Sequence, residues 1–185
     1  MKPQYTALIL TAALGAACER SATTESTASS KSAETGAGPS AALAAVIAAQ
    51  APAAPQAIHR VRDSAKPGDT VTLSGRVMGN MNPFTEGRAA FILGDPALLT
   101  ACNDIPGDEC ETPWDNCCDS PEDKKRGTAT IQVVDADGRV LRENIEGVGG
   151  IEKLAALTIT GTVADSSTPD ALIINASAIH SAIGN

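Results

Sequence analysis

The sequence predicts an all-β domain with one short helix, a five-stranded Greek-key barrel that follows a signal peptide and a disordered linker. Three observations lead to this class. Five segments between residues 57 and 182 alternate apolar and polar residues with the period of a strand. Turn-forming Gly, Asp and Pro residues separate these segments. One short stretch between the third and fourth segments has helical spacing instead.

The predicted strands cover residues 70–78, 88–93, 128–134, 157–163 and 171–179. Successive side chains of a strand point to opposite sides, so alternation assigns an apolar face to each. The faces expected in the first, second and fourth strands are Val71, Leu73, Gly75 and Val77; Ala89, Phe91 and Leu93; and Leu157, Ile159, Gly161 and Val163. In the last strand, Leu172, Ile174, Ala176 and Ala178 oppose Ile173, Asn175, Ser177 and Ile179.

Residues 149–156 have room for one or two helical turns, with Ile151 and Leu154 three positions apart. The order of three strands, a short helix and two strands resembles that of an OB-fold, a small Greek-key barrel. The strings TLSGRV at 72–77 and TITGTV at 158–163 each carry a mid-strand glycine, similar to OB-fold domains of the nucleic-acid-binding, anticodon-like type. Glycine there relieves crowding where a strand bends sharply. A β-sandwich of the same strands is the alternative, and neither fold implies a function.

Residues 1–17 are expected to be a signal peptide, because residues 5–17 are uncharged and shorter than the roughly 20 residues that span a bilayer. Residues 14–18, LGAAC, resemble the lipobox of bacterial lipoproteins. That resemblance implies that Cys18 is lipidated and becomes the N-terminus. The protein is then anchored in the cell envelope, facing the periplasm, in the outer membrane or on the outer face of the inner membrane. The alternative is cleavage after Ala17 with Cys18 left as a free thiol, but lipidation explains the odd number of five cysteines.

Residues 18–56 contain the lipidated Cys18 and a tether rich in Ala, Ser, Thr and Pro that is expected to be disordered, because it cannot bury enough apolar area to offset its ordering entropy. Residues 41–50, AALAAVIAAQ, allow two or three helical turns before Pro52 and Pro55. An isolated helix of that length is marginal in water, so we interpret the segment as linker. The barrel domain is predicted to begin at residue 57.

The formal charge of −8 and an aromatic content of 2 % disfavour nucleic acid as a partner, because the chain repels phosphate backbones and offers few surfaces for stacking bases. No nucleophile elbow, P-loop or dinucleotide fingerprint is present, so we expect neither an enzyme nor a cofactor. His59 and His180 are expected at the surface. The expected partners are the membrane, through the lipid, and an unknown envelope protein or small ligand.

A cysteine-rich insertion covers residues 97–126 and contains Cys102, Cys110, Cys117 and Cys118. Two disulfides are expected, because an exported location is oxidising. Adjacent cysteines seldom bridge, which leaves Cys102–Cys117 with Cys110–Cys118, or Cys102–Cys118 with Cys110–Cys117. Pro113 and Trp114 are expected to pack over the bridges. The alternatives are a zinc or copper(I) site made by all four thiolates, and redox chemistry at a labile bridge.

Residues 110–118 read C-x-T-P-W-D-x-C-C, and this string resembles a group of uncharacterised exported OB-fold proteins. That resemblance supports the fold and implies no reaction. The function expected from the sequence is a non-enzymatic, lipid-anchored envelope module that binds an unknown ligand. The alternatives are a metal-binding envelope protein that uses the four-cysteine loop, and an OB domain that binds oligonucleotides or oligosaccharides.

Overall fold

The computed structural model describes residues 38–182, so the predicted signal peptide and Cys18 lie outside the described residues. The described elements follow one another as α1 (Ala41–Ala45), β1 (Gln56–Ala57), α2 (Ile58–Ser64), β2 (Thr70–Val77), β3 (Ala90–Gly94), the 3-10 turn η1 (Cys102–Asp104), α3 (Pro121–Gly127), β4 (Thr128–Gln132), the 3-10 turn η2 (Val148–Gly150), β5 (Ala156–Val163) and β6 (Leu172–Ser181). All five predicted strands are present, with bounds that differ by one or two residues.

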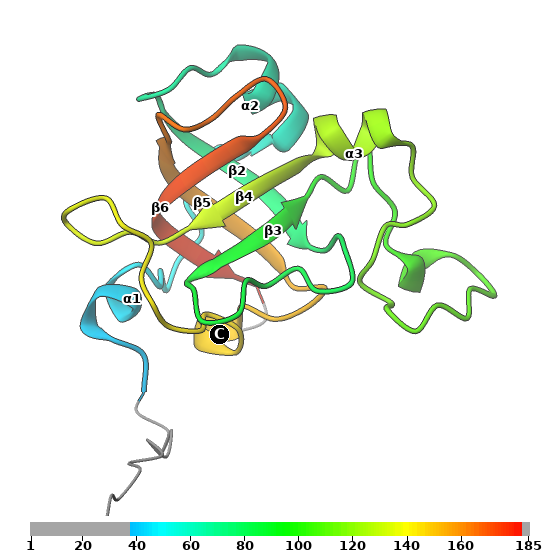
Figure 1. Ribbon diagram of the computed structural model, residues 1–185, viewed down its shortest axis with the longest axis horizontal. Coiled ribbons are helices and arrows are strands. Elements are labelled where there is room, and N and C mark those ends of the chain that lie inside the picture. The colour runs from blue at the N-terminus through cyan, green and yellow to red at the C-terminus, as the bar shows by residue number, and fades with distance from the viewer. Residues whose placement is uncertain (1–37, 183–185) are drawn as a thin grey trace, which may run out of the picture. The chain divides into compact units, whose positions relative to one another are not determined.

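The strands form a closed barrel in which β2, β3, β4, β6 and β5 are neighbours in that order and β5 pairs back onto β2 (Figure 1). Pairing is parallel between β4 and β6 and antiparallel at the other four seams. Closure confirms the predicted five-stranded OB-like Greek-key barrel. The β-sandwich alternative is wrong, because β5 pairs with β2 over seven positions rather than packing on it face to face.

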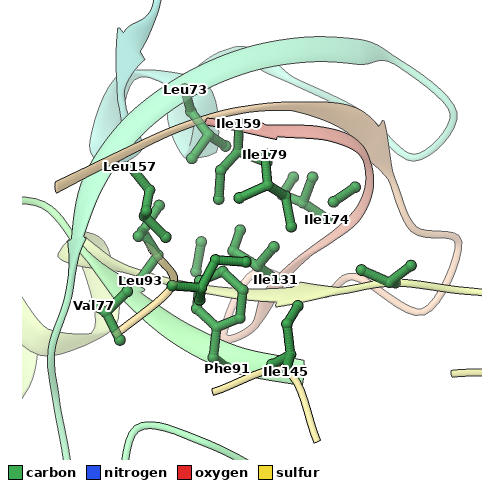
Figure 2. Close-up of a cluster of buried hydrophobic side chains, with 14 of the residues drawn as sticks. Leu73, Val77, Phe91, Leu93, Ile131, Ile145, Leu157, Ile159, Ile174 and Ile179 are labelled. Carbon is green, nitrogen blue, oxygen red and sulfur yellow. The ribbon is translucent and has the colours of Figure 1, made fainter. Parts of the chain in front are cut away.

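The core is built from side chains that each strand turns toward the barrel axis (Figure 2). The expected inward faces of β2, β3 and β5 are confirmed as buried. The bulkiest fully buried contributors include Leu73, Phe91, Leu93, Ile131, Leu157, Ile159 and Ile174.

Two glycines allow the barrel to close tightly. A Cβ on Gly75 would lie 2.7 Å from the carbonyl oxygen of Gly94, and one on Gly161 would lie 2.5 Å from that of Asn175. Both obstacles are backbone atoms, which cannot move aside as a flexible side chain could. The bending role predicted for the two mid-strand glycines therefore has a direct steric basis.

Strand β6 departs from the predicted alternation after Ala176. The register with β5 shifts between Thr160 and Gly161, so the chain carries one extra residue at Ser177. A bulge of this kind moves the following side chains to the opposite face. Ile179 is consequently buried, with 1 % of its surface exposed, and Ala178, predicted to share the face of Ala176, is half-buried.

The helix predicted for residues 149–156 is wrong. The structure has only η2 there, and Gly149 and Gly150 adopt positive φ angles of 58° and 78°, followed by Leu154 at 68°. A left-handed residue ends a right-handed helix, so no second turn forms. Ile151 is nevertheless fully buried and contributes to the core as its apolar character indicates.

The predicted tether is too long at its C-terminal end. Residues 38–56 are described as part of the folded unit, and Leu43 of α1 is 0 % exposed within the main core. The following residues join β6, with Ile179 donating its N–H to Val46 and Ala48 donating to Ile179. Leu43 lies in the core, and Val46 and Ile47 pack against it. This alanine-rich stretch is ordered because the barrel supplies the apolar surface that an isolated helix lacks. The ordered domain starts well before residue 57.

Replacing Gly161 by Ala is expected to lower the free energy of unfolding by about 3 kcal/mol, near the upper end for overpacking, because the new methyl group meets the β6 backbone. Urea denaturation measures this change. Gly38→Ala is the matched control, since a Cβ there meets nothing within 4 Å. Equal stability of the two variants would contradict the steric account of closure.

Leu43→Ala is expected to destabilise the barrel by about 2–5 kcal/mol, the usual loss for a buried leucine. A disordered tether would make the same change neutral. Thermal unfolding compares it with Ala42→Gly, an exposed position in the same helix where the loss is about 1 kcal/mol at most.

Candidate functional site

The cysteine-rich loop leaves the barrel at the end of β3 and returns through α3 (Figure 1, green, at the right). A small second cluster of buried residues, Met78, Leu99 and Ala101, anchors its first half against the end of β2. Arg76 adds a polar tie: its Nε donates to the carbonyl of Leu154 at 3.0 Å, and its guanidinium forms an ion pair with Asp104 of η1. The loop is therefore built on the barrel wall.

Backbone hydrogen bonds fold the loop back on itself. The N–H of Cys102 donates to Asp115 at 2.7 Å, and the N–H of Asn103 donates to Pro113 at 2.8 Å. A third bond, from the N–H of Gly79 at the end of β2 to the carbonyl of Trp114 at 2.9 Å, holds the second half of the loop against the barrel. These bonds bring residues 113–117 beside Cys102, which is the juxtaposition that creates the site.

Helix α3 was not predicted, although the sequence carries its signal. Ser120 is the N-cap, with Oγ accepting the N–H of Asp123 at 3.0 Å, and Pro121 occupies the first turn. Acidic residues stand at the N-terminus and basic residues at the C-terminus, as the helix dipole favours. The string SPEDKKR at 120–126 is thus a helix-start pattern within a loop that was expected to be irregular.

Three thiols meet at one place. The Sγ atoms of Cys102, Cys110 and Cys117 all lie within 4.8 Å of one another, and Cys102 and Cys117 are 3.5 Å apart. The sulfur of Cys118 lies 3.8 Å from that of Cys117. Cys102 is buried, Cys110 is half-buried, and Cys117 and Cys118 are exposed.

All four thiols are free in the structure, and the two predicted disulfides remain a prediction. Of the two pairings that the spacing leaves open, the 3.5 Å separation favours Cys102 with Cys117. The same separation also resembles the edge of a tetrahedral zinc–thiolate centre, where bonds of about 2.3 Å place neighbouring sulfurs about 3.8 Å apart. The four residues predicted as disulfide partners or metal ligands thus lie in one cluster.

The thiols differ in their readiness to ionise. Burial, together with the neighbouring sulfurs of Cys117 and Cys110, raises the pKa of Cys102 to about 12. Hydrogen bonding from the side chain and backbone of Thr112 lowers the pKa of Cys110, whose sulfur lies 3.4 Å from the Thr112 hydroxyl. The proximity of Cys117 raises the pKa of Cys118. Cys110 is thus favoured over Cys102 and Cys118 to form the thiolate first.

Trp114 does not belong to the buried cluster that anchors the loop. Its indole Nε1 donates to the carbonyl of Met81 at 3.0 Å, and the ammonium of Lys153 lies 4.5 Å from its ring centroid. The second cluster instead consists of aliphatic residues from the barrel and the first half of the loop. Trp114 therefore joins the loop to the β2–β3 connection.

The two histidines are half-buried and hydrogen-bonded, so the expectation of surface histidines is wrong. His180 Nδ1 lies 3.1 Å from the carbonyl of Ala48. His59 Nδ1 lies 2.7 Å from a carboxylate oxygen of Asp95, which also accepts the His59 backbone N–H at 3.0 Å. Asp95 is 1 % exposed and joins α2 to the start of the loop.

Asp95 stays ionised despite its burial. Burial by itself raises the pKa of its carboxyl group, but hydrogen bonds from the backbone of His59 and Ala97 and from the His59 ring outweigh it and lower the pKa below its ordinary value. The Asp95 backbone also accepts from Leu98 and Leu99 at 3.0 and 2.9 Å. Asp95 thereby organises the first turn of the loop, with its carboxylate accepting from Ala97 and its main-chain carbonyl accepting from Leu98 and Leu99.

No family model, curated protein or solved structure matches the chain. Within residues 38–182, no helix has the length and apolar character needed to cross a membrane.

Asp95→Asn is expected to lower stability at pH 7 by about 1.5–3 kcal/mol, the range for hydrogen bonds to a charged group. The pKa of Asp95 is lowered on folding, so its contribution is present above the unfolded pKa of about 3.9 and is lost as pH falls through the folded value. Urea unfolding between pH 7 and pH 3 should therefore show a difference in the free energy of unfolding between the wild type and Asp95→Asn that becomes smaller toward low pH.

Asp170→Asn is the control for removing a surface charge, because Asp170 is exposed and its pKa is lowered by its pairing with the exposed Lys125. Exposed ion pairs of this kind contribute little to stability, so we expect a smaller gap than for Asp95→Asn at every pH. A gap between the wild type and Asp95→Asn that stays constant down to pH 3 would refute the role of the Asp95 charge.

Proposed function

We propose that this chain is an exported envelope lipoprotein, anchored through Cys18, whose OB-like barrel carries a thiolate site for zinc or copper(I). The observation that carries the proposal is the convergence of the Cys102, Cys110 and Cys117 sulfurs within 4.8 Å on a loop held by the barrel. The protein acts as a binding module and not as an enzyme.

Thiolate ligands suit zinc and copper(I) better than they suit hard cations such as Mg²⁺ or Ca²⁺. The buried Cys102 and the half-buried Cys110 form the inner side of the site, and the exposed Cys117, from the second half of the loop, forms its outer side. Cys118 lies 3.8 Å from Cys117 and is exposed, so its side chain can turn in as a fourth ligand. Oxygen of Thr112 beside Cys110 supplies a polar neighbour of the kind that orients metal ligands.

Export and anchoring rest on the sequence. The lipobox-like residues 14–18 assign Cys18 to the membrane and leave four cysteines for the domain. A diacylated cysteine holds a protein at a bilayer stably, because each buried methylene contributes about 0.8 kcal/mol. The barrel then faces the periplasm and exchanges metal there.

A structural role for the four cysteines is the second candidate, favoured by the 3.5 Å approach of Cys102 and Cys117. A bridge between them would close a loop of about 15 residues and stabilise the domain by about 3 kcal/mol in the chain-entropy model. The envelope location is the same in both cases, and only the state of the sulfurs differs.

Intact-mass measurement on protein purified from the envelope without reductant separates the two candidates. We expect a diacylglyceryl adduct on Cys18, one zinc or copper ion in the native spectrum, and the mass of four free thiols after denaturation. A mass four hydrogens lower with no metal would overturn the metal site and establish two disulfides. An unmodified Cys18 behind an intact Met1 would overturn the anchor.

Cys110→Ser should weaken metal binding by more than about 100-fold. Losing a residue that only orients a ligand weakens metal binding by up to about 100-fold, and losing a direct thiolate ligand should weaken it further. Competition with a chromophoric chelator measures this affinity. Cys18→Ser is the matched control, because it removes a cysteine and its lipid but leaves the loop intact. It should bind metal as the wild type does.

A further inference from the structure

A second candidate site lies on the barrel wall beside the cysteine loop. A cavity of about 280 Å³ is bounded by Ile92 of β3, Thr130 of β4 and Leu172 of β6, with Arg62, Lys124 and Asn116 around it. Drug-sized ligands occupy pockets of about 300–1,000 Å³, which places this cavity at the lower end of that range. Its wall draws on strands, both neighbouring helices and the loop.

The cavity is positive in a chain whose formal charge is −8. Arg62 donates to the carbonyls of Pro169 at 3.1 Å and Thr128 at 2.6 Å, and Lys124 donates to the carbonyl of Cys117 at 3.0 Å. These acceptors are neutral, so they orient the two cations without cancelling their charge. Asp170 is the acidic residue in the wall, and it forms an ion pair with Lys125.

Burial also leaves Arg62 poorly solvated. Desolvation lowers the pKa of its guanidinium even though Asp170 and Asp63 act in the opposite direction. Its Nε has no hydrogen-bond partner within the described part of the chain. An anion in the cavity would supply the charge compensation that water supplies to exposed arginines.

Asn116 provides a third feature. It is 3 % exposed, it lines the cavity, and among the described residues its amide nitrogen has no hydrogen-bond partner. An unpaired buried amide destabilises a protein by about 1–3 kcal/mol. A rotation that turns this amide into the cavity breaks no hydrogen bond of that nitrogen, and a ligand oxygen would accept from it.

We propose that this cavity binds a small oxyanion, with inorganic phosphate as its representative, between Arg62, Lys124 and Asn116. The site uses none of the cysteine side chains and is therefore distinct from the proposed metal site, although Lys124 also donates to the carbonyl of Cys117. Oxyanions match guanidinium, ammonium and amide donors, whereas a neutral ligand would leave Lys124 without an acidic partner in the wall and Arg62 with only the longer-range charges of Asp170 and Asp63. A long polyanion is disfavoured, because the acidic chain repels it beyond the cavity.

Isothermal titration of the purified mature protein with sodium phosphate, at ionic strength held constant with sodium chloride, tests the proposal. We expect saturable binding of one phosphate and a rise in the melting temperature with phosphate concentration, as selective binding to the folded state requires. Lys124→Gln should weaken phosphate binding about tenfold or more. Asn116→Asp, which keeps the side-chain size and adds a negative charge, should abolish it.

Arg126→Gln is the charge-matched control, because Arg126 is exposed, pairs with Asp63 at 3.5 Å and lines a neighbouring cavity only. If phosphate affinity falls equally in Lys124→Gln and Arg126→Gln, the loss reflects the net charge of the protein and not a contact in the cavity. That result would overturn the site. No saturable binding to the folded wild type, or tighter binding of a single-stranded oligonucleotide than of phosphate, would also overturn it. Metal content measured in the same samples keeps this outcome separate from that of the cysteine loop.

Discussion

Closure of the barrel depends on two strands, β2 and β5, coming closer to their neighbours than any side chain allows. Gly75 and Gly161 stand at these close approaches, and the nearest obstacles that a Cβ would meet include main-chain oxygens. Strand β2 pairs with β5 along its length and with β3 at its end, so its curvature determines where β3 leaves the barrel. The cysteine loop begins at the end of β3, and Ile92 of β3 lines the cavity beside that loop.

The loop has few apolar residues, and beyond the small cluster of Met78, Leu99 and Ala101 its order comes from polar interactions. The buried carboxylate of Asp95 fixes the first turn, and backbone hydrogen bonds between residues 102–103 and 113–115 fix the return. Asn116 and Cys117 are adjacent in the chain but belong to different places, the cavity wall and the thiol cluster. Because neighbouring residues project in different directions from an ordered backbone, one loop can build two sites.

Much of the barrel could be predicted, because alternation reports directly which side of a strand is buried. The faces of β2 and β5 followed from their patterns residue by residue. The bulge at Ser177 could not be predicted, since it depends on the partner strand at Gly161 and not on the local pattern. The glycine pair at 149–150 signalled a break in the expected helix, and Leu43 could be recognised as core only once the barrel was present to receive it.

The candidate sites also combine features that the local sequence predicts with features that depend on contacts between distant segments. Residue types identified the four cysteines as one functional unit, and the distances among three of their sulfurs agree with that grouping. Their convergence depends on main-chain hydrogen bonds between distant segments, which leave no trace in composition. The cavity was not predicted, because Arg62, Asn116 and Lys124 come from separate elements that meet only in the folded domain.

The ring of paired strands also limits how the domain can recognise another protein. Every strand of the described barrel except the two-residue β1 has a partner on both sides. A sheet without free edges offers almost no unpaired main chain for an incoming peptide to extend, and it gives little template for edge-to-edge aggregation. Partners of this domain must therefore be selected by side chains and loops and not by strand addition.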